Sequence, residues 1–443
     1  MHVHTHSKRS HHGMPKMPDW LSVEQALEKI LSYVNVLEVE ERPLLEALGQ
    51  TLAEDLRATF PVPPHANSSM DGYAVQAADI KEASDHKKAM LKVIGELAAG
   101  HVPSQTVTPG AAIRIMTGAL IPSGADTVVP FEETDELERA KHGEGARKEI
   151  GILAHLPKGA NIRYAGEDIE KGEVVLQKGV VLRAAELGVI ASLGHPTVRV
   201  IRRPVVAILA TGDELADPSE PLAPGKIYNS NSYSIAASVL RYGGIPKLLG
   251  IARDNLPDLE TKIRQGLTAD MLVTTAGVSR GDYDIVKDVL MKQGEIAFWT
   301  VRMRPAKPLA FGALTARAPD GRERKVPHLG LPGNPVSSLV AFEQFGRAAI
   351  LKMMGKANLA KPTVKAVLED PIENTDDRRV YARVHVAKRN GVYYARLTGS
   401  QSSGVLTSMA KANGLAICPE GVPVMPAGAT VDVQMLDWTE EQG

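Results

Sequence analysis

Apolar runs and helix-spaced apolar positions alternate between residues 203 and 356, and this is the clearest pattern in the chain. Strand-like runs are expected at 205–210, 248–252, 271–276, 309–312 and 328–331, and helices at 234–244, 258–267, 284–294 and 336–354. Buried strands that alternate with helices of this length are typical of a parallel sheet covered on both faces. The pattern therefore predicts a doubly wound, mostly parallel α/β domain over 203–357.

The N-terminal half carries two kinds of pattern. Apolar residues recur at helical spacing in 23–31, directly after the N-cap candidate Ser22, and again in 44–48 and 183–193. From residue 60 the chain is first too rich in proline and small polar residues for regular structure, and strand-like runs with Gly and Pro then follow to about 131. The charge-dense stretch 132–148 is expected to be a solvated loop or hairpin. We predict that the helices pack together in a discontinuous domain (19–57 and 151–202), with a strand-rich domain (58–150) inserted into it.

Short alternating strands dominate the C-terminal segment, 358–443. They are expected at 364–369, 380–387, 392–397 and 430–436, with one helix-like interruption at 402–412. This succession predicts a small β-barrel or a β-sandwich, and we expect the barrel, so the fold class is α/β plus β with several domains. Residues 1–18 are rich in histidine and are expected to form a disordered tail, whose role the sequence leaves open.

Composition and charge exclude two classes of partner. The formal net charge is −1 and only 4% of the residues are aromatic, which leaves neither a positive field nor many stacking platforms for nucleic acid. No stretch approaches the roughly 20 apolar residues that span a bilayer, and the N-terminus lacks the apolar core of a secretory signal. The single cysteine, Cys418, lies in an apolar run and is expected in a core. We predict a cytoplasmic protein that binds neither nucleic acid nor membranes.

Polar and glycine-rich segments follow the strands of the predicted sheet. Because ligands bind beyond the carboxyl ends of parallel strands, these segments are expected to share one rim. Its carboxylates are Asp213, Glu214, Asp254, Asp282 and Asp284, and its glycine-rich turns are 277–281 and 332–335. The run 229–232 adds N-cap candidates and hydrogen-bond donors at the start of a helix. Carboxylates beside a phosphate suit Mg²⁺, and Arg302, Arg304 and Lys307 offer charge for further phosphates.

Each of these features also has a purely structural interpretation. A single aspartate after a strand is as often a helix cap or a surface residue as a ligand, and a glycine is often a plain turn. The convergence of five acids with two glycine-rich turns favours a ligand site. No Gly-x-Gly-x-x-Gly follows the first strand and no P-loop pattern occurs, which argues against a dinucleotide dehydrogenase and a P-loop hydrolase.

Several motifs together resemble one known family. They are "NSSMDGYAV", "RIMTGALIPSGADTVV", "TGDEL", "GVSRGDYD", "MRPAKP", "LPGNPVSS" and "GSQSSGVLTSMAKANGLA", in this order between about residues 19 and 436. No single motif is specific, but the ordered set resembles the molybdopterin molybdenumtransferases. This is the molybdenum insertase family, to which the E domain of gephyrin also belongs.

The resemblance implies an activity and an architecture. Family members take molybdate and adenylylated molybdopterin, cleave the adenylyl phosphoanhydride with Mg²⁺ or another divalent metal, leave molybdenum on the dithiolene and release AMP. They form elongated homodimers of four-domain subunits, with the active cleft between the α/β domain of one subunit and the Asp71-bearing domain of the other. Molybdopterin adenylyltransferase and recipient molybdoenzymes are implied as transient partners.

The resemblance also implies roles for residues. Catalytic roles fall on Asp71, Thr117, Asp254, Asp284 and Lys307, and metal binding on Glu214, Asp254 and Asp284. Substrate binding falls on Asp213, Gly277, Ser279, Gly281, Arg304, Pro332, Gly333, Asn334, Pro335 and Ser402. Two positions depart from the family pattern: Ala306 stands where a glycine is usual, and Arg280 stands where an apolar residue is common.

Three other interpretations remain open at the level of the sequence. The chain could adenylylate molybdopterin with ATP, which a related α/β domain does, or serve as a non-catalytic pterin-binding scaffold. Tungsten could replace molybdenum, because the two oxyanions are nearly isosteric. The residues do not decide whether molybdate or water attacks the anhydride.

Overall fold

The computed structural model describes residues 20–141, 148–253, 255–275, 290, 292, 294–317 and 321–438. Two units divide the chain. The first comprises residues up to Glu40, Gly49–Thr51 and residues from Val200 onward. The second comprises Glu41–Leu48 and Leu52–Arg199.

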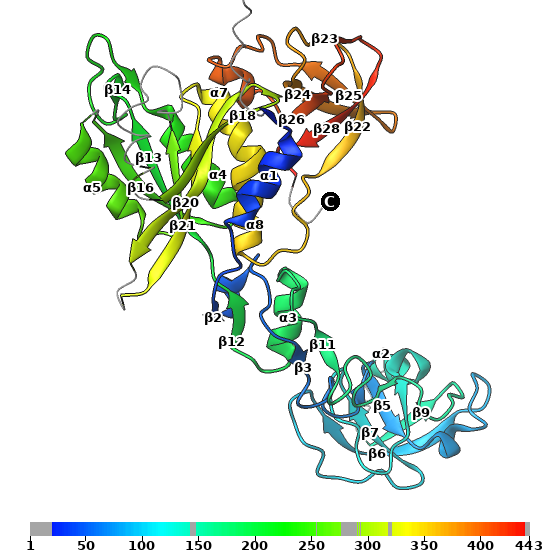
Figure 1. The fold of residues 1–443 in the computed structure, drawn as a ribbon. Coiled ribbons are helices and arrows are strands. Elements are labelled where there is room, and N and C mark those ends of the chain that lie inside the picture. Colours follow the sequence, from blue (N-terminus) through cyan, green and yellow to red (C-terminus); the bar gives the residue numbers. More distant parts are fainter. Residues whose placement is uncertain are drawn as a thin grey trace, which may run out of the picture. The chain divides into compact units, whose positions relative to one another are not determined.

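A seven-stranded sheet forms the centre of the first unit (Figure 1). In spatial order its strands are β1 (Trp20–Leu21), β18 (Gly294–Val301), β20 (Pro308–Arg317), β21 (Glu323–Leu331), β17 (Met271–Thr275), β13 (Val205–Thr211) and β16 (Ile245–Ala252). Neighbours are parallel except at β18–β20 and β20–β21, which are antiparallel. The predicted mostly parallel α/β domain is confirmed, whereas the sequence pattern predicts neither β1 nor β18.

Both faces of this sheet are covered, as predicted. On β13, Val206 and Ile208 belong to one apolar core, and Ala207 and Leu209 belong to another, because successive side chains of a strand point to opposite faces. The first core also contains residues of α4 (Ser230–Arg241) and of the continuous helix α7 (Pro335–Ala341), η4 (Phe342–Gly346) and α8 (Arg347–Met353). The second contains residues of α5 (Leu256–Gly266). The helix predicted at 336–354 is confirmed with a π-helical turn at η4, and the helix predicted at 284–294 lies almost entirely outside the described residues.

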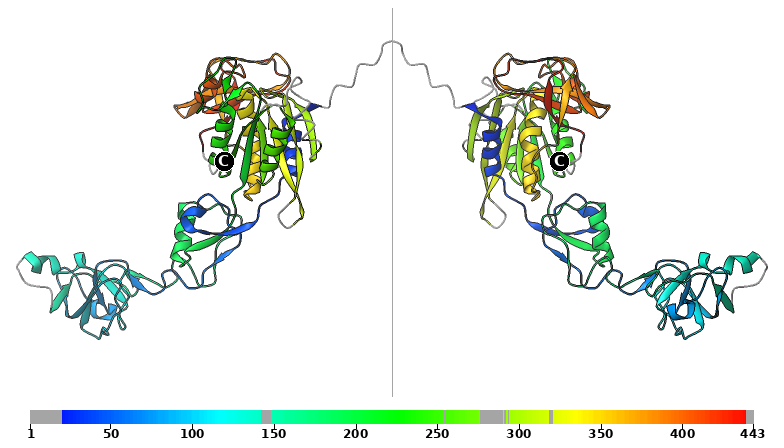
Figure 2. Two further views of the ribbon diagram at one scale, coloured as in Figure 1. Left: turned by 90° about the vertical axis from the view of Figure 1, so that its left-hand side faces the viewer. Right: turned by 90° about the vertical axis from the view of Figure 1, so that its right-hand side faces the viewer.

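The first helix has the predicted cap but not the predicted neighbour. Ser22 caps α1 (Val23–Ser32) by accepting a hydrogen bond from the Gln25 backbone N–H over 3.1 Å. The buried side chains of α1, Val23, Ala26 and Ile30, belong to the core of the α/β sheet, and α1 packs against α8 and η4 (blue against yellow in Figure 1 and Figure 2). The prediction that α1 packs with the helix at 183–193 is therefore wrong. Helical periodicity identifies an apolar face but not the surface that covers it.

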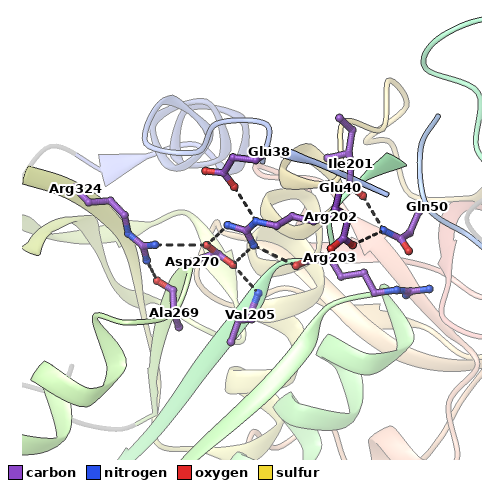
Figure 3. A network of polar contacts seen from close by, with 10 residues as sticks. All are labelled: Glu38, Glu40, Gln50, Ile201, Arg202, Arg203, Val205, Ala269, Asp270 and Arg324. Carbon is purple, nitrogen blue, oxygen red and sulfur yellow. Dashed lines mark hydrogen bonds and ion pairs between the residues drawn. The ribbon is translucent and has the colours of Figure 1, made fainter. Parts of the chain in front are cut away.

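A polar network anchors the amino end of β13 (Figure 3). The Arg202 guanidinium donates two hydrogen bonds to the Asp270 carboxylate, over 2.6 and 2.7 Å, and a third to Glu38 over 2.7 Å. The Val205 backbone N–H donates to Asp270 over 2.8 Å. Asp270 is buried, with a side chain 7% exposed, so its charge is compensated by a bidentate partner as buried charges require.

A five-stranded sheet forms the core of the second unit. Its spatial order is β8 (Thr127–Pro130), β5 (Gly72–Val75), β7 (Ala111–Ile115), β6 (Ala89–Leu97) and β9 (Glu149–Ile152). The helix predicted at 183–193 is confirmed as α3 (Ala184–Ser192), and the pattern at 44–48 forms the 3-10 helix η1 (Leu44–Ala47). The expectation of a loop over 132–148 is wrong in part, because α2 (Glu136–Lys141) is helical. The sequence pattern did not reveal this short helix, because the segment is dense in charged residues. Its first turn is acidic and its last turn is basic, as the helix dipole favours.

The C-terminal segment closes into a barrel. Its strands follow the order β24 (Arg379–Arg389), β25 (Val392–Leu397), β22 (Thr363–Leu368), β28 (Thr430–Met435) and β26 (Gly414–Cys418), and β26 pairs back onto β24. From outside the segment, β19 (Met303–Arg304) pairs with β24. The predicted β-barrel is confirmed, and the helix-like interruption is α9 (Leu406–Ala410). Cys418 is fully buried in the barrel core, as expected.

The remaining described elements are short. They are β2 (Val39–Pro43), β3 (Leu56–Arg57), β4 (Asn67–Ser68), η2 (Ala77–Ile80), η3 (Phe131–Glu133), β10 (Ile162–Arg163), β11 (Val174–Leu176), β12 (Thr197–Ile201), β14 (Leu215–Ala216), β15 (Ile227–Tyr228), β23 (Ile372–Glu373) and β27 (Val424–Met425). Across the described ranges, no helix combines the length and the apolar character needed to cross a bilayer.

Candidate functional site

The carboxyl ends of four parallel strands form one rim of the α/β sheet. The strands β21, β17, β13 and β16 are consecutive neighbours, so the segments that follow them leave from the same edge. Asp213 and Glu214 follow β13 and are exposed, and the turn 332–335 follows β21. Gly212, with φ +139°, allows Glu214 to fold back, because a Cβ there would lie 2.4 Å from the Glu214 carboxylate.

Part of the predicted rim lies outside the described residues. This applies to Asp254, Gly277, Ser279, Gly281, Asp282 and Asp284. Within the described ranges, no group of three or more His, Cys, Asp or Glu side chains is placed to hold a metal ion. The predicted metal set of Glu214, Asp254 and Asp284 therefore stays a prediction.

The turn 332–335 is tied to two neighbouring elements. The Gly333 carbonyl accepts a hydrogen bond of 2.7 Å from the Asn231 side chain in the first turn of α4. That helix begins at Asn229, whose side chain accepts a hydrogen bond from the Ser232 backbone N–H over 3.2 Å. On the other side, the Val336 N–H donates to the Ser403 carbonyl over 3.1 Å. The structure thus brings the segment that carries the predicted substrate-binding residue Ser402 beside this turn.

The turn after β18 carries the predicted phosphate-binding residues. It is closed by a hydrogen bond of 3.0 Å from the Val301 N–H to the Lys307 carbonyl. Ala306 in this turn has φ +80° and is buried, a left-handed conformation that glycine adopts without strain and alanine does not. The positive φ of residue 306 explains why glycine suits this position. The Arg304 guanidinium donates to the Thr375 hydroxyl over 3.1 Å, and the Lys307 ammonium is exposed.

A cavity of about 260 Å³ lies between this turn and the barrel. Its lining residues are Arg304, Pro305, Pro371, Ile372, Glu373, Val380, Ala382, Arg383, Leu397 and Gln401. Arg383, on β24, is 1% exposed and donates hydrogen bonds to the Ser408 hydroxyl and to the Ser400 and Ser402 carbonyls. In the described part of the chain, no carboxylate forms an ion pair with Arg383.

Arg383 is the functional candidate that the sequence reasoning missed. Burial first, and then the nearby charge of Arg304, lower the pKa of Arg383 to about 10, so the guanidinium is still cationic at neutral pH. Two guanidinium groups at one cavity suit an anionic ligand with several oxygen acceptors. The sequence feature that could have identified Arg383 is its position as a single arginine within the apolar strand run "VYARVHV".

Asp71 and Thr117 meet in the second unit. The pairing of Gly72 with Ile115 across β5 and β7 places the two residues just beyond the paired strands. Thr117 donates to the Asp71 carboxylate from its backbone N–H (2.7 Å) and from its hydroxyl (2.8 Å). These two hydrogen bonds, the backbone one first, hold the pKa of Asp71 below its ordinary value. Gly72 permits the approach of β8, because a Cβ would lie 1.9 Å from the Val129 carbonyl oxygen.

Comparison with known proteins accounts for most of the chain. Residues 21–194 match a family model described as the MoeA N-terminal region (domain I and II), residues 207–352 match the probable molybdopterin binding domain, and residues 365–436 match the MoeA C-terminal region (domain IV). A molybdopterin molybdenumtransferase of a Nostoc species is 36% identical over 97% of this chain and 97% of its own length. The Bacillus subtilis protein of the same name is 35% identical over 96% and 95%. A solved molybdopterin biosynthesis MoeA protein of Pyrococcus horikoshii is 30% identical, with a TM-score of 0.75 over 94% of this chain and 100% of that one.

Proposed function

Because the chain belongs to the molybdopterin molybdenumtransferase family, we propose that it inserts molybdenum from molybdate into adenylylated molybdopterin. The reaction cleaves the phosphoanhydride, releases AMP and leaves molybdenum on the dithiolene. Cytoplasmic localisation is part of the same proposal. It is supported by the single cysteine, which is free and buried in the barrel core, because thiols stay reduced in the cytoplasm.

The observation that carries the proposal is the cavity that holds Arg304 and Arg383. A buried guanidinium without a carboxylate partner among the described residues is costly unless an anion compensates it. Molybdate and phosphate are both tetrahedral anions whose oxygens accept hydrogen bonds from guanidinium groups. The cavity thus offers a place for a molybdate or phosphate group between the turn after β18 and the barrel.

The chain's own residues then have distinct tasks. Arg304, Arg383 and Lys307 bind and orient the anionic oxygens, which keeps the breaking anhydride in line. The turn 332–335 and the predicted turn 277–281 cradle the pterin and nucleotide with backbone groups, and Asp213 and Ser402 contribute to substrate binding. Asp71, ionised and held by Thr117, supplies a fixed carboxylate to the cleft.

A magnesium requirement is part of the proposal. Hard cations take carboxylate oxygens, and Glu214 offers such a donor at the rim of the sheet, with Asp254 and Asp284 as the predicted further ligands. When bound, Mg²⁺ supplies charge neutralisation to the phosphoanhydride.

A homodimer completes the proposed cleft, with Asp71 and Thr117 coming from one subunit and the rim of the α/β sheet from the other. Two inactive variants test this arrangement, Asp71→Asn and Asp284→Asn. If each cleft takes Asp71 from one subunit and Asp284 from the other, a mixed dimer has one cleft with both aspartates and one with neither. If each cleft lies within one subunit, no cleft of a mixed dimer keeps both. Random pairing of the two variants should therefore restore about a quarter of the wild-type activity. No restored activity, or a fully active monomer in sedimentation, contradicts the shared cleft.

Release of AMP tests the proposed reaction. Purified protein is mixed with adenylylated molybdopterin, Mg²⁺ and molybdate, and AMP is measured together with the reconstitution of a cofactor-free molybdoenzyme. Insertion is supported if AMP appears only when molybdate is present and the acceptor enzyme becomes active. Replacement of molybdate by tungstate tests the choice of metal. Binding without AMP under any metal or oxyanion contradicts the proposal and favours the scaffold interpretation. Consumption of ATP with unmodified molybdopterin favours the adenylyltransferase alternative.

A matched pair of arginine variants tests the role of the cavity. Arg383→Met should weaken molybdate binding on the order of tenfold or more, because it removes a charged hydrogen-bond donor from a buried site. Arg389 lies on the same strand but is exposed and forms an ion pair with Glu369, so Arg389→Met should bind molybdate as the wild type does. Equal affinity of the Arg383→Met protein removes the cavity from the proposed site.

A further inference from the structure

The ammonium of Lys307 lies over the indole ring of Trp20, 4.8 Å from the ring centroid. A cation at this distance from an aromatic face is attracted by the ring's quadrupole, most strongly by tryptophan. Lys307 is exposed, and among the described residues no carboxylate forms an ion pair with it. The indole ring is therefore the contact in the structure that orients this side chain.

Trp20 is itself held in place by the edge of the α/β sheet. It lies on β1, which pairs in parallel with β18 through Trp20–Thr300 and Leu21–Val301. The Arg302 N–H donates to the Leu21 carbonyl over 2.9 Å. The same two-residue strand thus fixes both the start of the phosphate-binding turn, at Arg302, and the side chain at its end, Lys307.

From this geometry we infer that Trp20 is a positioning residue for Lys307. The inference rests on the proposed function, in which Lys307 binds an oxyanion of the substrate. A lysine side chain that is free in solution must be immobilised when it binds a ligand, and an aromatic ring that already holds the ammonium at the rim reduces that cost. Trp20 therefore raises the affinity for the oxyanion through Lys307, without touching the oxyanion itself.

A double-mutant cycle in the full chain tests this role, with molybdate as the probe and equilibrium titration as the measurement. Trp20→Leu should weaken molybdate binding two- to fivefold, the range expected for an exposed cation–π contact. Trp20→Phe, which keeps an aromatic face, should fall between leucine and the wild type. In a Lys307→Met background, Trp20→Leu should cause no further loss, because the ammonium that Trp20 holds is gone.

A second cation–π pair provides a matched control. Lys29 on α1 lies 5.1 Å from the ring centroid of Trp299, in the same unit but outside the phosphate-binding turn. Lys29→Met removes an equivalent contact and should leave the molybdate affinity unchanged. Thermal unfolding of each variant shows whether the fold is retained.

The outcomes distinguish the positioning role of Trp20 from the oxyanion-binding role of Lys307. If the wild type binds molybdate and Lys307→Met weakens binding, but Trp20→Leu does not, the positioning role is wrong while the proposed function stands. A Trp20→Leu effect that persists in the Lys307→Met background also overturns it, since the effect then does not pass through Lys307. If the wild type fails to bind molybdate, or Lys307→Met binds it equally well, the oxyanion role itself is wrong and the positioning role falls with it.

Discussion

Thr117 donates two hydrogen bonds to one oxygen of Asp71, Oδ1, although the two residues come from motifs 46 positions apart in the chain. The backbone N–H and the hydroxyl of Thr117 thereby fix the orientation of the Asp71 carboxylate. Both residues are exposed, so a carboxylate that would otherwise rotate freely in water has a defined direction.

Removal of the Thr117 hydroxyl should weaken this arrangement without abolishing it. In Thr117→Val the backbone hydrogen bond remains, so we expect a fall in kcat on the order of tenfold, whereas Thr117→Ser should stay close to wild type. The pKa of Asp71 should rise, because a hydrogen bond to its ionised form is lost. If the ionised form is the active one, the acid limb of the pH–rate profile moves to higher pH. An unchanged profile would separate the hydroxyl from the function of Asp71.

Replacement of Asp71 itself should be more severe. Asp71→Asn keeps the shape of the side chain and loses its charge, so AMP release should fall by about 100-fold or more while the fold is retained. The measurements are AMP release and the circular dichroism spectrum. Near-normal turnover by a folded Asp71→Asn protein contradicts a catalytic role for this carboxylate.

The predicted metal ligands Asp254 and Asp284 can be tested in the same way. Asp254→Asn and Asp284→Asn should each abolish insertion and raise the Mg²⁺ concentration needed for any residual rate, because amides bind hard cations more weakly than carboxylates do. Glu220→Gln, an exposed carboxylate beyond β14, serves as the control and should have no effect. If both aspartate variants turn over normally at limiting Mg²⁺, the assignment of the metal site fails.

Ala306 allows a prediction about stability. A left-handed alanine costs about 1–2 kcal/mol relative to glycine, which offsets the loss of a buried methyl group and the greater flexibility of an unfolded glycine. Ala306→Gly should therefore change the free energy of unfolding by less than about 1 kcal/mol. Ala310→Gly, at a fully buried position in β20, lacks this compensation and should destabilise by at least about 1 kcal/mol more. Urea unfolding of both variants measures the difference, and equal destabilisation would contradict strain at Ala306.

The Arg202–Asp270 pair should stabilise the fold in a pH-dependent way. Burial alone would raise the pKa of Asp270, but the hydrogen bonds from Arg202 and Val205 and the charge of Arg324 outweigh it and lower the pKa below its ordinary value. Because the pKa is lower in the folded state than in the unfolded state, the pair's contribution is complete above about pH 4 and is lost as pH falls through the folded pKa. Asp270→Asn should cost about 3 kcal/mol at pH 7, as expected for a broken buried pair.

Urea unfolding at a series of pH values measures this contribution. The difference between the wild type and Asp270→Asn should shrink as the pH falls below about 4. The exposed pair of Arg199 and Glu54 provides the contrast, since Glu54→Gln should cost less than about 1 kcal/mol. A difference that grows on acidification would reverse the assigned direction of the Asp270 pKa.

Local patterns were sufficient to predict the parts of this fold that depend on local physics. The apolar run at 205–210 and the described part of the run at 271–276 are buried strands of a parallel sheet. Asn229 and Ser22 cap helices, and the C-terminal strands form a barrel. The motifs at the strand ends also placed Asp213, Glu214 and the turn 332–335 on one rim, because parallel strands end at a common edge.

Tertiary structure alone decided which surfaces meet. It placed α1 on the α/β sheet, joined Thr117 to Asp71, buried Arg383 beside the Arg304 cavity and set Trp20 beneath Lys307. Residue type and spacing determine which face of an element is apolar and where a cap or turn falls, since these depend on neighbours within a few residues. The partner of that face, and the charge that a buried side chain faces, depend on segments tens to hundreds of residues away that only the folded chain brings together.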